Sequence, residues 1–247
     1  MIQVTGPYEV VPGQAPKRHV RVYVPRRAQR TDRPILFLFD GQNVFDDAPS
    51  FAGGWHAHIA VERLARKVPA PVVIGLDHGN EQRISELSPF DFGAVRGELD
   101  RQLAWIADWL LPKLRADHAL TSTPNRVIVG GSSMGGLASL YAALSRPDIF
   151  GGALSMSPSL WVGRGAMFRW AEKRGIPTGS RIYIDGGARE PRMIEAAGKM
   201  ADLLGRRGIK QLCFRSDPKG DHSERSWRRR LLPAMRFHFG TSRSPAR

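Results

Sequence analysis

RVIVGGSSMGGL occupies residues 126–137 and contains a G-x-S-x-G motif centred on Ser133. The run before Gly130 is apolar and β-branched, as in a buried strand, and residues 137–144 have the pattern of a helix. A nucleophilic serine must project from a tight turn, and glycines let the strand and the helix approach each other closely. An ordinary glycine-rich turn is the alternative, but the strand before the motif and the helix after it favour Ser133 as a nucleophile.

Strands alternate with helices on both sides of this motif. Short β-branched or aromatic runs predict strands at 21–24, 35–39, 72–76, 126–129, 152–156, 181–184 and 211–214. Helical spacing of apolar residues predicts helices at 98–115, 137–144, 191–206 and 226–238. This alternation is typical of parallel βαβ units, so we expect an α/β fold with a mostly parallel central sheet and helices on both faces. The first strands have no helix between them and are expected to form an antiparallel edge.

Length and composition fit one globular α/β domain. The chain has 247 residues, of which 42% are hydrophobic and 24% charged, which excludes a collagenous, coiled-coil or disordered protein. The lone Cys213 excludes an internal disulfide framework and fits a reducing compartment. No secretory signal or membrane-spanning run is visible, which predicts a soluble, cytoplasmic protein. We expect one domain over 1–247, with its core at about 16–240 and a basic tail at 241–247.

A serine nucleophile needs a base, and only two histidines follow Ser133 in the sequence. His238 lies on the apolar face of the last predicted helix, which indicates a packed structural residue. His222 lies in a polar turn between the last predicted strand and that helix. In α/β hydrolases the order along the chain is serine, acid, histidine, so His222 is the expected base.

The acid that would orient His222 can be either of two carboxylates. Asp185 ends the strand at 181–184, and Glu190 ends the loop that follows it. Each has a structural alternative, Asp185 as a turn former and Glu190 as an acid at the start of a helix. The residues alone do not separate them.

An oxyanion formed at Ser133 needs backbone N–H donors. In this arrangement they come from the residue after the nucleophile, here Met134, and from the loop after an early strand. That loop is DGQNVFD at residues 40–46, in which Gly41 allows a sharp turn. The Gln42 N–H is the expected second donor.

Four separated segments resemble one known family. They are FDGQNVFD at 39–46, GGSSMGGL at 130–137, SPSLW at 157–161 and HSERSW at 222–227. In this order they resemble the putative-esterase family of α/β hydrolases, which includes siderophore, feruloyl and acetyl-xylan esterases, S-formylglutathione hydrolase and mycolyltransferases. The resemblance spans about residues 16–240.

The resemblance implies an α/β-hydrolase fold and assigns roles to individual residues. Ser133 would be the nucleophile, His222 the base, and Gln42 and Met134 the oxyanion donors. The acid of the family typically ends a Gly-x-x-Asp/Glu loop, which matches GARE at 187–190 and favours Glu190 over Asp185. Some siderophore esterases work with serine and histidine alone, so a dispensable acid stays open.

Two further residues are candidates for substrate binding. Arg83 lies in a segment, 75–89, that also resembles the family, and it could bind an acidic or polyol substrate. Its alternative is an ion pair with Glu86 that holds the loop. Trp161 follows the strand at 152–156 and is expected to wall the pocket, although it could equally be a core residue.

Cofactor and metal motifs are not found. His56 and His58 suggest a metal site, but they are expected on different faces of a helix. Residues 40–47 fail the calcium-loop pattern because Gln42 and Val44 occupy ligand positions. We therefore expect no metal and no cofactor.

The net charge of +14 comes from 37 Lys and Arg against 23 Asp and Glu. Residues 17–33 hold seven basic residues and one acid, and residues 225–247 hold seven arginines and no acid. Such clusters can attract nucleic acid or other anions. Because these segments lie outside the proposed catalytic residues, we expect them on the outer surface, away from Ser133, and we do not expect nucleic-acid binding.

These observations together predict a serine carboxylic-ester hydrolase that works through an acyl-serine intermediate. The substrate would be a soluble small-molecule ester, either siderophore-type or a small acyl ester. An acyltransferase of the same fold is one alternative, and a non-catalytic hydrolase fold that binds anionic partners is another.

Overall fold

Eight strands form one sheet in the computed structural model, which describes residues 1–10, 17–50 and 52–240. The strand order is β1-β2-β4-β3-β5-β6-β7-β8. β1 and β2 pair antiparallel, β2 pairs antiparallel with β4, and all other neighbours are parallel. The bounds are β1 Gln3–Tyr8, β2 Arg18–Tyr23, β3 Ile35–Phe39, β4 Val72–Leu76, β5 Val127–Ser132, β6 Gly152–Met156, β7 Arg181–Gly187 and β8 Gln211–Asp217. The expected α/β fold with an antiparallel N-terminal edge is confirmed.

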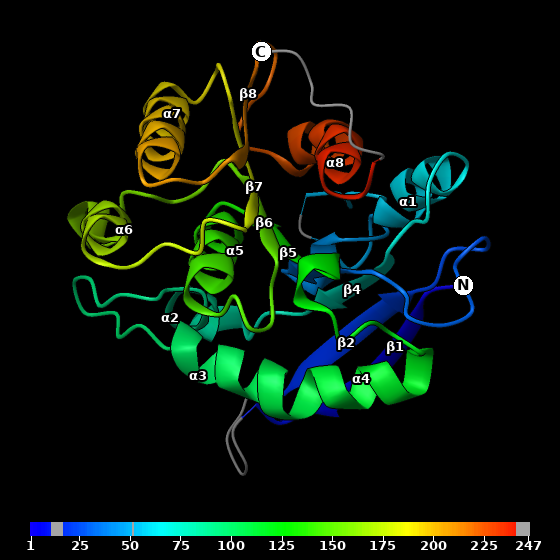
Figure 1. Cartoon of the computed structure of the whole chain (residues 1–247). Helices are drawn as coiled ribbons and strands as arrows, with labels where there is room; N and C mark the ends of the chain where they lie inside the picture. The colour runs from blue at the N-terminus through cyan, green and yellow to red at the C-terminus, as the bar shows by residue number, and fades with distance from the viewer. Residues whose placement is uncertain (11–16, 51, 241–247) are drawn as a thin grey trace.

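Helices cover both faces of the sheet (Figure 1). One face carries α1 and α8, and the other carries α3 to α7. The bounds are α1 Ala57–Ala65, α2 Arg83–Glu86, α3 Leu99–Trp105, α4 Leu111–His118, α5 Met134–Ser145, α6 Val162–Lys173, α7 Pro191–Arg206 and α8 Glu224–Phe239. Short 3-10 turns η1 Gly41–Asn43, η2 Asn80–Gln82 and η4 Pro124–Arg126 join the elements.

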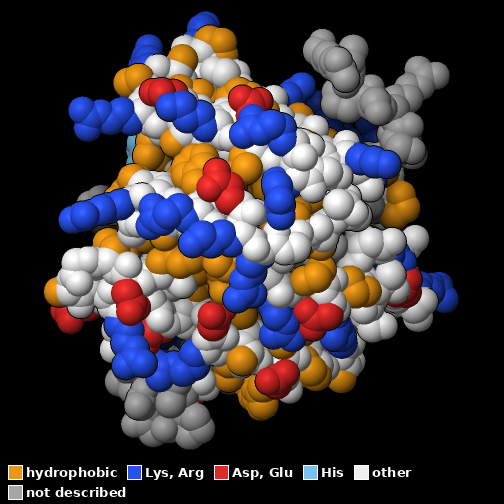
Figure 2. All heavy atoms as spheres, turned by 60° about the vertical axis from the view of Figure 1, so that its left-hand side comes forward, with side chains coloured by type: hydrophobic (Ala, Val, Ile, Leu, Met, Phe, Trp, Pro, Cys, Tyr) orange, Lys and Arg blue, Asp and Glu red, His pale blue; other side chains and the backbone are white. Residues whose placement is uncertain are grey.

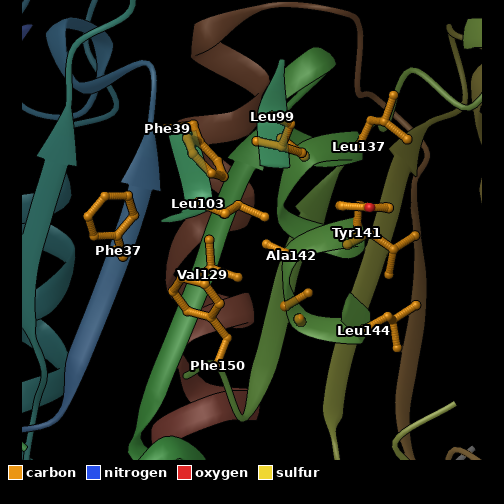
Figure 3. Close-up of a cluster of buried hydrophobic side chains, with 14 of the residues drawn as sticks. Phe37, Phe39, Leu99, Leu103, Val129, Leu137, Tyr141, Ala142, Leu144 and Phe150 are labelled. Atoms are coloured by element: carbon orange, nitrogen blue, oxygen red, sulfur yellow. The ribbon is translucent and has the colours of Figure 1, made fainter. Parts of the chain in front are cut away.

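β3 shows why the central strands are apolar throughout. Alternate side chains of a strand point to opposite faces of the sheet. Leu36 and Leu38 accordingly pack in the cluster that contains α1 and α8, while Phe37 and Phe39 pack in the cluster beneath α3 to α7. Figure 3 shows part of this second cluster, where Leu137, Tyr141 and other side chains of α5 meet β3 and β5. All five β3 residues are buried, so both faces of the strand stabilise the sheet.

Several elements differ from the sequence-based expectation, and α6 and the short α2 were not among the predicted helices. β1 was not predicted, because its exposed residues show neither a continuous apolar run nor a regular alternation. The single helix expected over 98–115 consists of α3, a π-helical turn at Ile106–Leu110 and α4. Pro112 lies in the first turn of α4 and has no N–H to donate, so regular α-helical bonding cannot continue through it.

The basic tail expected at 241–247 and the first residue of the expected core, Pro16, lie outside the described residues. Within the described residues, no helix is both long and apolar enough to cross a membrane.

Candidate active site

Ser133 occupies the turn between β5 and α5 in a backbone conformation that non-glycine residues rarely adopt, with φ 55° and ψ −117°. Its N–H donates to the Met156 carbonyl at 2.9 Å, and its carbonyl accepts from the Ser159 N–H at 3.0 Å. A Cβ atom at Gly131 would lie 2.6 Å from the Gly135 carbonyl carbon, so this glycine is required for strand and helix to approach. The turn thus holds the serine in a strained position and directs its hydroxyl away from the sheet.

His222 lies next to this hydroxyl. Its Nε2 is 3.0 Å from Ser133 Oγ, and its Nδ1 is 2.6 Å from Glu190 Oε2. A neutral imidazole with its proton on Nδ1 donates to Glu190 and accepts the Ser133 proton at Nε2. The Trp227 indole meets the imidazole ring edge-on, with centroids 4.9 Å apart. This chain of hydroxyl, imidazole and carboxylate is the arrangement that activates serine as a nucleophile.

Glu190, not Asp185, is the carboxylate that reaches His222. Burial acts to raise the pKa of the Glu190 carboxyl, but hydrogen bonds from His222 and Ser157 outweigh burial and lower it. Asp185 is fully buried and is paired instead with Arg230 at 3.0 Å and with the Tyr183 hydroxyl at 3.1 Å. Burial raises the pKa of Asp185 to about 7, against the opposing effect of the Arg230 charge.

Gln42 and Met134 lie at the ends of neighbouring parallel strands. Gln42 follows β3 in η1, and Met134 is the first residue of α5. N–H groups in the first turn of a helix have no partner within the helix and can bind an anion. Gly41 is packed so tightly that a Cβ atom there would lie 2.6 Å from the Gly75 carbonyl carbon. The two loops also approach each other, since a Cβ atom on Gly135 would lie 3.3 Å from Asp40 Oδ2.

Arg83 binds the loop that carries Gln42. Its guanidinium forms two hydrogen bonds to the Asp40 carboxylate, at 2.7 and 2.8 Å. The alternative pair between Arg83 and Glu86 is wrong, because Glu86 is turned inward and pairs with the buried Arg18. The Arg83 side chain is 26% exposed, so part of it remains accessible beside the Asp40 turn.

Trp161 lies at the surface after the segment that contacts Ser133. Its side chain is 59% exposed and meets Phe92 edge-on, with ring centroids 5.9 Å apart. The alternative that Trp161 is a core residue is therefore wrong. In the same segment Ser159 Oγ lies 3.2 Å from Ser133 Oγ, a contact that the sequence-based interpretation missed.

Glu224 is a second residue that sequence reasoning missed. Its two carboxylate oxygens accept from Asn43 Nδ2 at 2.9 Å and from Trp55 Nε1 at 3.1 Å. Because Glu224 begins α8 two residues after His222, it joins the loop of the base to the loop of Gln42. Burial raises the pKa of this carboxyl. Its position in the motif at 222–227 is the only sequence signal that could have drawn attention to it.

The other three histidines considered in the sequence, His56, His58 and His238, contact residues outside the Ser133–His222 pair. His238 is buried as expected, with Nε2 3.0 Å from the Ala153 carbonyl oxygen. His56 precedes α1 and contacts Asp47 at 2.9 Å, while His58 lies 4.0 Å from Asp46. Among the residues that the structure describes, no group of three His, Cys, Asp or Glu side chains is arranged to hold a metal ion.

The sheet order, the strained serine turn and the position of His222 after the last strand define the class of the protein as an α/β hydrolase. A family model described as "Putative esterase" matches residues 15–238, and the chain belongs to that family.

Similar proteins support the same assignment. The chain is 28% identical to an iron(III) enterobactin esterase of Escherichia coli O6:H1 (strain CFT073) over 88% of this chain and 52% of the relative. It superposes on the enterobactin esterase of Shigella flexneri with a TM-score of 0.71 and 25% identity, over 88% of this chain and 54% of the other. The BES protein of Bacillus cereus shares the fold, with a TM-score of 0.77, 16% identity and coverage of 96% and 94%. The chain thus spans about half the length of the enterobactin esterases it matches.

Proposed function

We propose that this protein is a serine carboxylic-ester hydrolase that works through an acyl-serine intermediate. The observation that carries the proposal is the continuous hydrogen-bonded chain from Ser133 Oγ through His222 to Glu190, with distances of 3.0 and 2.6 Å. Membership of the esterase family supports the same activity.

The proposed reaction follows from the positions of these groups. His222 Nε2 removes the proton of Ser133 as Oγ attacks the ester carbonyl carbon, and the Gln42 and Met134 amides bind the resulting oxyanion. His222 then donates that proton to the departing alcohol, which leaves an acyl group on Ser133. A water molecule, deprotonated by His222, attacks the acyl group, and the acid and free serine are released.

The relatives suggest the class of ester. Two of them are named for enterobactin, an ester-containing siderophore, and we propose a siderophore-type or small acyl ester as the substrate. Trp161 is proposed as an aromatic wall of the substrate site because its ring is exposed beside the segment that contacts Ser133. Arg83 is proposed to hold the Asp40 turn through its bidentate pair, and its contact with substrate remains a prediction.

Replacement of the nucleophile tests the proposal. Ser133→Ala should lower the turnover of p-nitrophenyl acetate by at least about 10³-fold and abolish fluorophosphonate labelling, because it removes the hydroxyl that His222 Nε2 contacts. Ser132→Ala is the matched control, since it removes the neighbouring hydroxyl and leaves the Ser133–His222 contact in place. Labelling that persists in Ser133→Ala would refute the assignment of the nucleophile. Product analysis with glycerol present separates hydrolysis from acyl transfer.

A further inference from the structure

The hydroxyl of Ser157 lies behind Glu190, on the side away from His222. Ser157 follows β6, is fully buried, and its N–H donates to the Asp185 carbonyl at 2.9 Å. Its Oγ has three polar neighbours: Glu190 Oε1 at 3.0 Å, Arg230 Nη2 at 3.0 Å and Trp227 Nε1 at 3.2 Å. The proposed reaction assigns no role to this hydroxyl.

The chemistry of the neighbours fixes the direction of the hydroxyl proton. An indole N–H and a guanidinium N–H can only donate, so Trp227 and Arg230 occupy the two lone pairs of Ser157 Oγ. The single hydroxyl hydrogen must therefore point to Glu190 Oε1. The same oxygen also accepts the Gly187 N–H at 3.1 Å, which leaves Oε2 to face His222.

One of the two donors to Ser157, Arg230, is itself held in place. Arg230 has only 6% of its surface exposed, and its Nη1 lies 3.0 Å from Asp185 Oδ1. The other oxygen of Asp185 accepts from the Tyr183 hydroxyl at 3.1 Å. Asp185 therefore orients Arg230 instead of the histidine. Since these residues are buried, a change in the orientation of Ser157 Oγ would leave the Trp227 indole N–H or the Arg230 Nη2 group without its acceptor.

We propose that Ser157 is a positioning residue, whose hydroxyl is oriented by Trp227 and Arg230 and holds the Glu190 carboxylate so that Oε2 meets His222. The inference rests on the proposed function, because it concerns the acid of that reaction. With Ser157 in this role, the residues that support the reaction include a buried layer formed by β6, β7 and α8.

Substitution of Ser157 tests the inference. Ser157→Ala should lower kcat for p-nitrophenyl acetate by about 10- to 100-fold and leave KM within about twofold, because a misplaced carboxylate affects the chemical step. Ser157→Gly should be equally impaired: Ser157 has φ 40°, which glycine adopts without strain, so a shared loss isolates the hydroxyl from the backbone. Ser139→Ala is the control, since this buried serine donates to a helix carbonyl and should keep the parent kcat.

An NMR measurement can separate a loss of Glu190 positioning from a loss of folding, and it does not require enzymatic activity. The proton between His222 Nδ1 and Glu190 should give a low-field ¹H resonance, measured in a Ser133→Ala background. We expect Ser157→Ala to shift or broaden this resonance and Ser139→Ala to leave it unchanged. Trp227→Phe, which keeps an aromatic side chain but replaces the indole and its N–H with a smaller phenyl ring, should shift it less and carries the test if Ser157 variants unfold.

The outcomes distinguish the two proposals. Parent-like kcat in both Ser157 variants would overturn the positioning role, and so would a loss of kcat with an unchanged resonance. A parent protein that neither hydrolyses esters nor reacts with fluorophosphonate would overturn the proposed function, whereas the resonance would still report whether Ser157 holds Glu190.

Discussion

Two carboxylates, Glu190 and Asp185, share one buried cluster but differ in their nearest partners: Glu190 contacts His222, and Asp185 contacts Arg230. Glu190 receives hydrogen bonds from His222, Ser157 and the Gly187 N–H. Asp185 faces the Arg230 guanidinium. The first carboxylate can stabilise a positive imidazolium as it forms, while the second balances a permanent charge. Their roles should therefore separate in mutants.

We expect Glu190→Gln to lower kcat/KM by about 10²- to 10⁴-fold with little loss of stability, because an amide can favour the wrong imidazole tautomer. Asp185→Asn should retain activity within about tenfold but unfold at a lower temperature, since it removes the carboxylate 3.0 Å from the buried Arg230 and leaves only Glu190, 3.9 Å away, as a counter-charge. Steady-state kinetics and thermal unfolding of both variants measure this difference. Loss of activity in Asp185→Asn alone would reverse the assignment.

At the residue scale, local pattern identified those candidate residues whose positions depend on local structure. Ser133 has a glycine frame and His222 a position between strand and helix, and both can be read from the chain. The residues alone did not separate Glu190 from Asp185, because the choice depends on which carboxylate the folded loop turns toward His222, and only the resemblance of residues 187–190 to the family loop favoured Glu190. The functions of Ser157 and Glu224 depend on contacts with residues more than 30 positions away.

At the scale of elements, α8 contributes to several parts of the candidate active site. His222 precedes it, Glu224 in its first turn binds the loop of Gln42 through Asn43, and Arg230 in its middle orients Ser157. Near its C-terminal end, His238 Nε2 donates to the Ala153 carbonyl in β6. The helix is therefore fixed to the sheet by polar contacts along its whole length.

His238 predicts a specific dependence of stability on pH. Burial lowers the pKa of His238 to about 3, whereas the ordinary value is 6.5. Between these pH values the unfolded chain binds a proton that the folded chain does not, so stability falls as pH decreases from 6.5 toward 3, by up to about 1.4 kcal/mol per pH unit. Denaturant unfolding of His238→Gln should show a weaker dependence in this window. His19→Gln, at an exposed position, should retain the parent dependence, and equal slopes for parent and His238→Gln would contradict the prediction.

Elements buried on both faces were the most predictable from sequence. The apolar runs of β3, β4 and β5 identify strands because parallel strands contact helices on each side. Their spatial order was not predictable, since β4 inserts between β2 and β3 and no local signal encodes that choice. β1 shows the opposite limit: an exposed edge strand needs no apolar pattern because it buries little surface.

At the scale of the whole molecule, the positive charge is distributed differently from the sequence-based expectation. The two basic segments are not wholly peripheral: Arg18 pairs with Glu86 in the interior, Arg21 pairs with Asp77, and Arg230 lies in the layer behind the candidate active site. Exposed basic residues also lie along α6 and α7, among them Arg169, Lys173, Arg192 and Arg206. Figure 2 shows Lys and Arg side chains spread over this side of the molecule.

This distribution predicts how salt affects the reaction. Hydrolysis of a neutral ester such as p-nitrophenyl acetate should change less than about twofold between about 50 and 500 mM NaCl, because the charges around Glu190 are paired and buried. An anionic ester should show a KM that rises with salt, as screening weakens the attraction of the positive surface. Equal salt effects on the two esters would contradict this view.

A DNA duplex should keep its gel mobility at about 50 mM salt, and a retarded band would favour the anion-binding alternative.

The position of α8 has a consequence for biosynthesis. A chain emerging from the ribosome presents Ser133 and its glycine turn long before residue 222, and α8 leaves the exit tunnel only after residue 239 has been added. Until then the proposed nucleophile exists without its proposed base, without the donors to Ser157 and without the Glu224 link to the loop of Gln42. If the proposed function is right, we expect the nascent chain to react with esters only after this helix has packed against the sheet.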